Sequence, residues 1–319
     1  MMKRLFVCAM MALLAVAFVS AGGSSEGKSG AKKVFTVGIN NFGQANFFAR
    51  IGRDAMMSQI QKNGGKVVST VTADVSSRVA AIESFISQKV DAIIIEEGDI
   101  NQVAPPLAAA KKQGIIIGSM DGGDADFVDV FVESDNNQLG TKSAEKLMEF
   151  MGHKGTIVEI YNDAGSMIRV RKNALHEVVA KNPDVQVGYG FVYAWPDFLP
   201  DAKAKLEAIL QAHPKPGEIS GVFATFDGVG VAAAQAIRDA GLQKYISITG
   251  IDGDPEAYKE MRKPDSPFKA TLAQDPDTIA RTVVDRVFDL LNGKKIEQRH
   301  IYVPGILITK DNIPPEKTQ

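Results

Sequence analysis

Cysteine is nearly absent from this chain. Cys8 is the only cysteine among 319 residues, and it lies inside an apolar run near the N-terminus. If that run is removed during export, the mature chain has no thiol. The mature protein is therefore expected to have no disulfide bond and no metal site built on cysteine.

The first residues have the three parts of a secretory signal peptide. MMKR is a short basic start, residues 5–18 (LFVCAMMALLAVAF) are apolar throughout, and the tripeptide VSA supplies small residues for cleavage. The apolar run is too short to span a bilayer comfortably. We therefore expect residues 1–21 to be a cleaved signal peptide and residues 22–32, rich in glycine, serine and lysine, to be a flexible leader. A retained N-terminal anchor is the alternative.

The chain also lacks a strong excess of either charge. Its 36 lysine and arginine residues face 38 aspartate and glutamate residues, which gives a formal net charge of −2. No stripe of basic residues is present, so nothing favours nucleic acid as a partner. Charged residues make up 23% of the chain, the usual share in soluble globular proteins, so disorder is not expected outside the ends.

Catalytic motifs are missing as well. The four histidines are scattered without the spacing of metal ligands, and no Gly-x-Ser-x-Gly elbow marks a nucleophilic serine. Paired carboxylates could in principle cleave a glycosidic bond, but no acid/base pair can be assigned. These absences predict no metal site, no cofactor and no enzyme activity.

The sequence does contain a regular alternation of apolar strands and amphipathic helices. In the first half, strand-like runs occupy residues 34–39, 66–71, 91–96, 115–120 and 129–133. In the second half, they occupy residues 155–161, 185–193, 221–225, 245–251 and 268–274. Continuous apolar strands between such helices indicate parallel sheets covered on both faces. Two series of about 100–130 residues each predict an α/β fold with two doubly wound lobes.

Polar and aromatic residues gather where these strands end. In open α/β sheets, ligands bind outside the carboxyl ends of the strands. The candidates are Asn41, Phe47, Phe48, Asp121, Arg171, Trp195, Phe226, Asp227, Asp252 and Gln274. Sugars and polyols need this mixture, because their C–H faces pack on aromatic rings and their hydroxyls bond to carboxylates, amides and arginine.

Each candidate also has a purely structural interpretation. Asp121 and Asp252 precede glycines and could simply form turns, and Asp227 could be only a helix N-cap. Phe48 matches the core face of its helix, and Arg171 could be a solvated charge. Their shared position at strand ends, rather than any single residue, favours a ligand site.

The segment FATFDGVGVAA raises a different possibility, that of an NAD-dependent dehydrogenase. Gly228, Gly230 and Ala233 match Gly-x-Gly-x-x-Ala, and Asp252 lies at about the right distance downstream. Against this reading, two residues separate the strand from the first glycine, the segment lies in the second series of strands, and the protein is expected to be exported. We expect the glycines to let the helix pack closely on the sheet.

A set of segments distributed along the chain is distinctive in combination. The segments are NFF near the first strand, the aspartate after IIIGSM, VESDNNQLG, RVRKNAL, VFATFD before a Gly/Ala-rich helix, ITGIDGDP and ATLAQDP. Over about residues 33–310 the chain resembles the ribose-type periplasmic sugar-binding proteins of ABC transporters. The resemblance implies the periplasmic binding protein type I fold, with two lobes joined by a three-crossover hinge and closing on a sugar. The lobes would comprise residues 33–133 with 275–303, and 136–273 with 304–314.

The resemblance also implies roles for individual residues. Phe47 and Phe48 would border the sugar, and Trp195 would stack on it. The polar contacts would come from Asn41, Asp121, Arg171, Asp252 and Gln274.

Three positions depart from the ribose-type pattern. Gly122 stands where ribose binders carry arginine, Phe226 where asparagine is usual, and Ala45 where an asparagine precedes the phenylalanine pair. A related pentose, a furanose or a polyol is therefore expected rather than ribose. Asp227 would either cap its helix or reach the ligand.

Together these features predict an extracytoplasmic solute-binding protein. It would be a periplasmic monomer that captures a monosaccharide or polyol and delivers it to the membrane permease of an ABC transporter. The alternatives are a secreted sugar sensor for a chemoreceptor or kinase and, more remotely, the dehydrogenase. A LacI-type transcription factor shares the core, but here a signal peptide and a leader stand where its DNA-binding headpiece would be.

Overall fold

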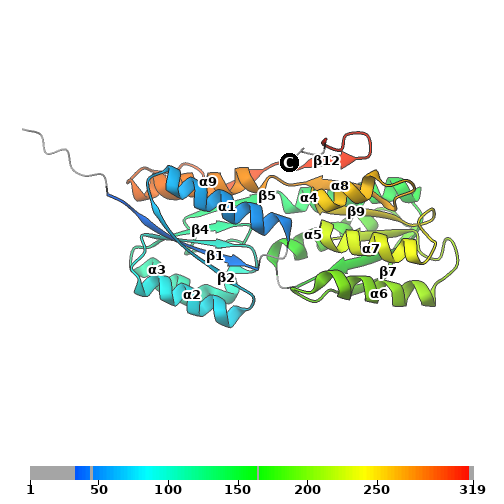
Figure 1. Ribbon diagram of the computed structural model, residues 1–319, viewed down its shortest axis with the longest axis horizontal. Helices are drawn as coiled ribbons and strands as arrows, with labels where there is room; N and C mark the ends of the chain where they lie inside the picture. Colours follow the sequence, from blue (N-terminus) through cyan, green and yellow to red (C-terminus); the bar gives the residue numbers. More distant parts are fainter. Residues whose placement is uncertain (1–32, 44–45, 164, 316–319) are drawn as a thin grey trace, which may run out of the picture. The chain divides into compact units, whose positions relative to one another are not determined.

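A computed structural model describes residues 33–43, 46–163 and 165–315. The predicted signal peptide, the leader and Ala45 lie outside these residues. From Val34 onward the chain clusters as one unit, which contains two six-stranded sheets with helices between the strands (Figure 1). No helix within the described ranges is both long and apolar enough to span a bilayer.

The first sheet has the strand order β11-β5-β4-β3-β1-β2, and its paired strands are all parallel. Strand β3 is buried at every position, as its apolar run of alanine and three isoleucines predicts for a strand covered on both faces. The strands are β1 (Thr36–Phe42), β2 (Lys66–Thr72), β3 (Ala92–Glu96), β4 (Ile116–Met120), β5 (Val130–Ser134) and β11 (His300–Val303).

The second sheet has the order β12-β10-β9-β8-β6-β7. The strands are β6 (Gly155–Tyr161), β7 (Val185–Val192), β8 (Gly221–Ala224), β9 (Ser247–Asp252), β10 (Phe268–Ala273) and β12 (Ile306–Thr309). This sheet is parallel except for β12, which pairs antiparallel with β10 so that Ile306 lies beside Ala273. The exception arises because β12 starts at the carboxyl end of β10, directly after β11 leaves the first sheet.

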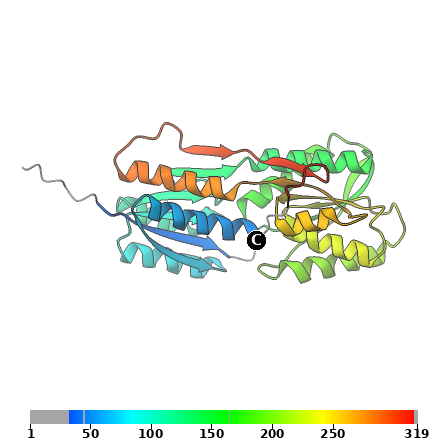
Figure 2. The same ribbon diagram turned by 45° about the horizontal axis from the view of Figure 1, so that its top comes forward.

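Helices cover both faces of each sheet (Figures 1 and 2). Alternate residues of β3 show why: Ile94 packs in the cluster under α1 and α9, whereas Ile93 and Ile95 pack in the cluster under α2 and α3. In the second sheet, α4 and α5 cover one face and α6, α7 and α8 the other. The two sheets with their helices therefore have separate hydrophobic cores.

The helices that pack on the first sheet are α1 (Phe47–Lys62), α2 (Val75–Ser87), α3 (Ala104–Lys112) and α9 (Pro276–Leu291), and a short 3-10 helix, η1 (Ile100–Val103), precedes α3. Those on the second sheet are α4 (Asn136–Met151), α5 (Ser166–Val179), α6 (Phe198–Ala212), α7 (Asp227–Asp239) and α8 (Pro255–Arg262). Helix α8 was not predicted from the sequence, although Asp254 at its N-cap and Pro255 at its first position are start signals.

The chain passes between the two sheets three times. It leaves β5 at Ser134 for α4, leaves β10 at Ala273 for α9, and leaves β11 at Val303 for β12. Aspartates that cap the following helix mark two of these passages: Asp135 accepts from Gln138 N at 2.9 Å, and Asp275 accepts from Thr278 N at 3.0 Å. The three passages agree with the predicted three-crossover hinge.

The glycines of the FDGVGVAA segment lie in the first turn of α7. A Cβ on Gly230 would come within 2.9 Å of the Phe268 ring and 3.3 Å of Ala224 Cβ, both on the sheet. The predicted close packing of helix on sheet is thus confirmed for Gly230, whereas a Cβ on Gly228 would meet Phe226 and Phe198, which lie outside the strands. Asp227 is the first residue of α7 and not its N-cap, which is Phe226. Its carboxylate instead accepts from the backbone amides of Gly253 and Asp254, at 2.8 and 2.9 Å.

Candidate functional site

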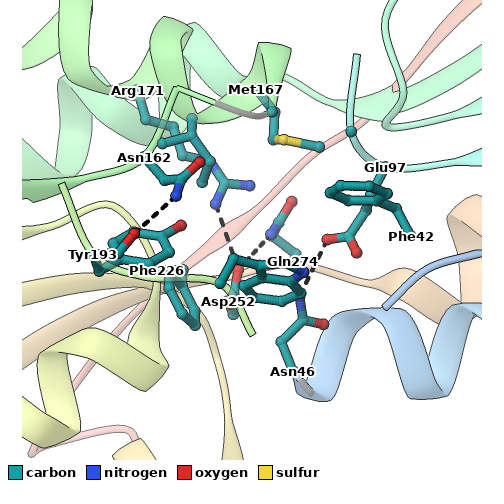
Figure 3. Close-up of a pocket in the computed structure, with 14 residues that line it drawn as sticks. Phe42, Asn46, Glu97, Asn162, Met167, Arg171, Tyr193, Phe226, Asp252 and Gln274 are labelled. Atoms are coloured by element: carbon teal, nitrogen blue, oxygen red, sulfur yellow. Dashed lines mark hydrogen bonds and ion pairs between the residues drawn. The ribbon is translucent and has the colours of Figure 1, made fainter. Parts of the chain in front are cut away.

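A cavity lies at the carboxyl ends of both sheets (Figure 3). Its empty volume is about 540 Å³, a figure that includes the open space at its mouth. The lining residues follow strands or begin helices. They are Phe42, Asn46, Glu97, Gly98, Asn162, Gly165, Met167, Ile168, Arg171, Tyr193, Trp195, Phe226, Asp252 and Gln274.

Half of the predicted site residues line this cavity: Arg171, Trp195, Phe226, Asp252 and Gln274. All five come from the second sheet or from the passage that leaves it. Strand-end reasoning therefore located this wall of the cavity well.

The polar part of this wall is built around Asp252, the last residue of β9. Its Oδ1 accepts from Gln274 Nε2 at 2.7 Å and lies 3.6 Å from Arg171 Nη1. Arg171 is only 2% exposed, so the interpretation as a solvated charge is wrong. Its Nε donates to Asn136 Oδ1 at 2.9 Å and its Nη1 to the Thr225 carbonyl at 3.0 Å, which fixes the guanidinium in place.

The apolar part of the wall is formed by the rings of Tyr193, Trp195 and Phe226, which pack with a fourth ring, Phe198, outside the lining. Trp195 stacks on Phe198 with 5.6 Å between ring centroids, and Phe198 meets Phe226 edge-on at 4.9 Å. Tyr193 packs against Phe226 at 5.3 Å. Two polar atoms of the lining, Trp195 Nε1 and Gln274 Oε1, are buried and have no hydrogen-bond partner in the described structure. One is a donor and the other an acceptor, so both are available to a ligand.

The opposite wall contains residues that sequence reasoning missed. Glu97 and Gly98 follow β3, and both have left-handed backbones, with φ of 51° and 74°. The buried Arg78 of α2 stabilises this turn by donating to the carbonyls of Glu96 and Glu97 at 2.6 and 2.8 Å. The sequence does carry a signal, because EGD (residues 97–99) directly follows the predicted strand 91–96, but the candidates include no residue of that strand end.

The remaining predicted residues are placed outside the cavity lining. Asn41 is fully buried and donates to Glu96, and Phe48 is 2% exposed in the core cluster under α1. Phe47 begins α1 beside it but does not line the cavity. Asp121 and Asp227 are buried with their own partners: Asn136 Nδ2 donates to Asp121 at 3.1 Å, and Thr271 Oγ1 to Asp227 at 2.8 Å.

Contacts also join the two sides across the cavity. Ser166 N, at the start of α5, donates to the Gly98 carbonyl at 3.2 Å. Three residues further on, Arg169 Nη2 pairs with Asp99 Oδ2 at 2.5 Å. These contacts connect the loop after β3 in the first sheet with a helix of the second.

The carboxyl groups around the cavity repel one another. Burial raises the pKa of Glu97 to about 8, and the charges of Asp121 and Asp252 add to this shift. Burial also raises the pKa of Asp252 to about 7, although the Arg171 guanidinium opposes the shift. Glu133, next to Asn136, has its pKa raised to about 8 by burial and by Asp121. The site is therefore rich in carboxyls that resist ionisation.

These shifts predict that the ligand-free protein becomes less stable as the pH rises. Each of these carboxyls has a folded-state pKa above its unfolded value, so its contribution to stability is full below the unfolded pKa. That contribution is lost as the pH rises through about 7 to 8. We expect the melting temperature to fall on the order of 5 °C between about pH 6.5 and about pH 9 in a thermal melt.

A pair of variants separates this cause from general charge effects. Glu133 faces Asp121, Asp135, Arg171 and His300, and Glu133→Gln should remove part of the fall. Glu83→Gln, at an exposed position of α2, should leave it intact. A melting temperature that is flat or rises over this pH interval would contradict the assignment.

Within the described residues, no group of three or more His, Cys, Asp or Glu side chains is arranged to hold a metal ion. The chemistry that the cavity offers is hydrogen bonding and stacking. Carboxylates and amides accept from hydroxyls, the guanidinium donates, and the aromatic rings pack on C–H faces.

Known proteins have this fold and can be aligned with most of this chain. The chain is 27% identical over 273 residues to the ribose import binding protein RbsB of Bacillus subtilis (strain 168), covering 85% of this chain and 86% of that protein. It is 26% identical over 281 residues to the xylitol-binding protein of Mycolicibacterium smegmatis, covering 87% and 78%. Among solved structures, an ABC transporter solute-binding protein from Agrobacterium vitis with bound allitol matches with a TM-score of 0.84 and 28% identity, over 89% of this chain and 98% of that one.

The family assignment rests on most of the chain. Residues 35–295 match the family described as periplasmic binding protein domain, and the two sheets match solved members of that fold. The predicted resemblance and the predicted α/β fold of two sheets are both confirmed. The family consists of substrate-binding proteins of transporters and not of enzymes. This chain belongs to the periplasmic binding protein family.

Proposed function

We propose that the protein captures a monosaccharide or polyol in the cavity and delivers it to the membrane permease of an ABC transporter. The observation that supports this most directly is the convergence of Arg171, Asp252 and Gln274 with an aromatic wall at the strand ends. Relatives named for ribose and xylitol, and a structure with bound allitol, support the ligand class. We further propose that residues 1–21 direct export to the periplasm and are then removed.

We propose two lobes around this cavity, made of residues 33–133 with 275–303 and residues 136–273 with 304–314. The separate cores of the two sheets and the three short passages between them support this division. Ligand that touches both lobes would stabilise the closed arrangement, because only that arrangement makes both sets of contacts. The pairs Ser166–Gly98 and Arg169–Asp99 are contacts that closure would form.

Within this site, we assign different roles to the polar and the apolar part of the wall formed by the second sheet. Asp252, Arg171 and Gln274 would bond ligand hydroxyls, and Trp195 and Phe226 would pack on the C–H face. The other predicted residues act indirectly in this proposal. Asp121 helps to orient Asn136, which in turn orients Arg171. Asn41 and Phe48 support the first sheet, and Phe47 begins α1. Asp227 holds the turn after β9.

A thermal-shift panel tests the proposal. The purified protein is melted with D-ribose, D-xylose, L-arabinose, D-galactose, ribitol, xylitol, allitol and NADH. A ligand at about a thousand times its dissociation constant adds roughly 4 kcal/mol to the folded state, so a cognate sugar or polyol should raise the melting temperature by about 10 °C.

The panel also separates the alternatives. A shift with NADH and with no sugar or polyol would contradict the proposal and restore the dinucleotide interpretation of Gly228 and Gly230. A shift with several sugars of one configuration would identify the hydroxyl groups that the site recognises.

A further inference from the structure

The charges around the cavity are unbalanced. Among the described residues of the lining, Glu97 and Asp252 carry carboxyl groups and Arg171 carries the guanidinium. Arg171 lies 3.6 Å from Asp252, so these two charges match each other. Asp121, just behind the lining, shares Asn136 with Arg171 through hydrogen bonds of 3.1 and 2.9 Å. The Arg171 guanidinium also acts on Glu97 and Asp121, so three carboxyl groups share one cation in this group.

Arg78, a second buried cation that acts on Glu97, does not correct the imbalance. Arg78 lies outside the lining and donates to Asn40 Oδ1 at 2.7 Å and to two backbone carbonyls. Its first charge partner is the buried carboxyl of Glu96. Burial raises the pKa of Glu97 to about 8, and the charges of Asp121 and Asp252 add to this shift. A neutral ligand would leave this repulsion in place.

The side chains around the cavity suit a cation as well as a sugar. Figure 3 shows Glu97, Arg171 and Asp252 converging on one space, which Phe42, Tyr193 and Phe226 border. Aromatic faces attract ammonium groups, most strongly when water is excluded. Glu97 is only weakly engaged within the protein, since Asn46 Nδ2 reaches it at 3.4 Å. Its carboxyl is thus available to a ligand group.

We propose that the preferred ligand is a polyhydroxylated compound with one protonated amino group, such as an amino sugar or amino polyol, whose ammonium pairs with Glu97. This inference rests on the proposed function and narrows its ligand class. The hydroxyls bond to Asp252, Arg171 and Gln274, while Trp195 Nε1 and Gln274 Oε1 gain the partners that they lack. Glu97 directly follows β3 of the first sheet, and Asp252 ends β9 of the second. One ligand that contacts both residues therefore connects the two sheets.

Matched pairs of ligands test the inference. Isothermal titration calorimetry compares D-glucosamine with D-glucose, D-galactosamine with D-galactose, and 1-amino-1-deoxy-D-sorbitol with D-sorbitol. At least one amine should bind about tenfold or more tighter than its neutral parent, as expected for a charge-assisted contact. In buffers of different ionisation enthalpy, amine binding near pH 7 should release up to about one proton, because Glu97 ionises on pairing.

The variant Glu97→Gln should abolish both the preference for the amine and the proton release. The exposed control Glu83→Gln should keep both. If Glu97→Gln does not fold, the proposal is still tested by two measurements on the wild-type protein. They are the ratio of its affinities for an amine and the neutral parent, and the proton release on amine binding. If neutral compounds bind and no amine binds more tightly than its neutral parent, the cationic assignment is overturned and the proposed function stands. Failure of every amine and every neutral compound of this panel and the earlier one overturns both.

Discussion

Replacing Arg78 by methionine is expected to lower the melting temperature by about 10 °C. Arg78 is 2% exposed, and its donors reach Asn40 Oδ1 and the carbonyls of Glu96 and Glu97 at 2.6 to 2.8 Å. Burial lowers its pKa to about 10, but it stays charged at neutral pH. Removing it leaves Asn40 Oδ1 and two backbone carbonyls without their donors, and each buried acceptor that loses its partner costs about 1–3 kcal/mol.

The same change should also weaken ligand binding, because Arg78 holds the turn that presents Glu97. Gly98 in that turn has φ of 74°, and a Cβ there would meet the Arg78 guanidinium, so the two residues fit closely. The matched control is Arg286→Met, at an exposed position of α9 where the arginine pairs with Asp289 at 3.3 Å. An Arg78→Met protein that melts within about 2 °C of the wild type would show that this network contributes little.

The sequence predicted one wall of the cavity and missed most of the other, and β1 shows why. The apolar pattern predicts a strand that ends at residue 39, which would place Asn40 and Asn41 beyond it. The strand actually runs to Phe42. Asn40 and Asn41 are therefore fully buried inside the sheet, where they bond to Arg78 and Glu96, and Phe42 is the residue that reaches the cavity. Apolar periodicity could not show this, because the polar residues Asn40 and Asn41 interrupt the apolar run before Phe42.

Backbone conformation explains a second group of misses. Glu97 enters the cavity through a left-handed turn, and non-glycine residues in that conformation cannot be recognised from hydrophobic patterning. Phe48 is the reverse case. Helix α1 begins at Phe47, and the period of the helix turns Phe48 to the core with Met56 and Ile60. The structural interpretation of Phe48 that its spacing supported agrees with this placement.

The second sheet was predicted better because its polar residues are held by long-range pairs at true strand ends. Asp252 ends β9, and Gln274 directly follows β10, the neighbouring strand. Parallel neighbours end at the same edge, so the two side chains meet at 2.7 Å although 22 positions separate them. Placing polar residues at strand ends therefore identified the pair that meets at the ends of these two neighbouring strands.

Replacing Asp252 by alanine is expected to weaken binding of the cognate ligand about 100-fold, because a hydrogen bond to a buried charged group is worth about 1.5–3 kcal/mol. The change removes an acceptor that Gln274 Nε2 now orients and that lies 3.6 Å from Arg171. Titration calorimetry with the compound that gives the largest thermal shift measures the loss. The exposed Asp54→Ala, at 64% side-chain exposure on α1, is the control and should bind normally.

The stability of the ligand-free variant separates loss of binding from loss of folding. Burial raises the pKa of Asp252 to about 7, so the carboxyl gains little from being ionised in the empty site. The melting temperature of ligand-free Asp252→Ala should therefore stay within about 4 °C of the wild type, even though affinity collapses. Normal affinity in a folded Asp252→Ala protein would remove Asp252 from the site, and with it the main reason for placing the ligand against the second sheet.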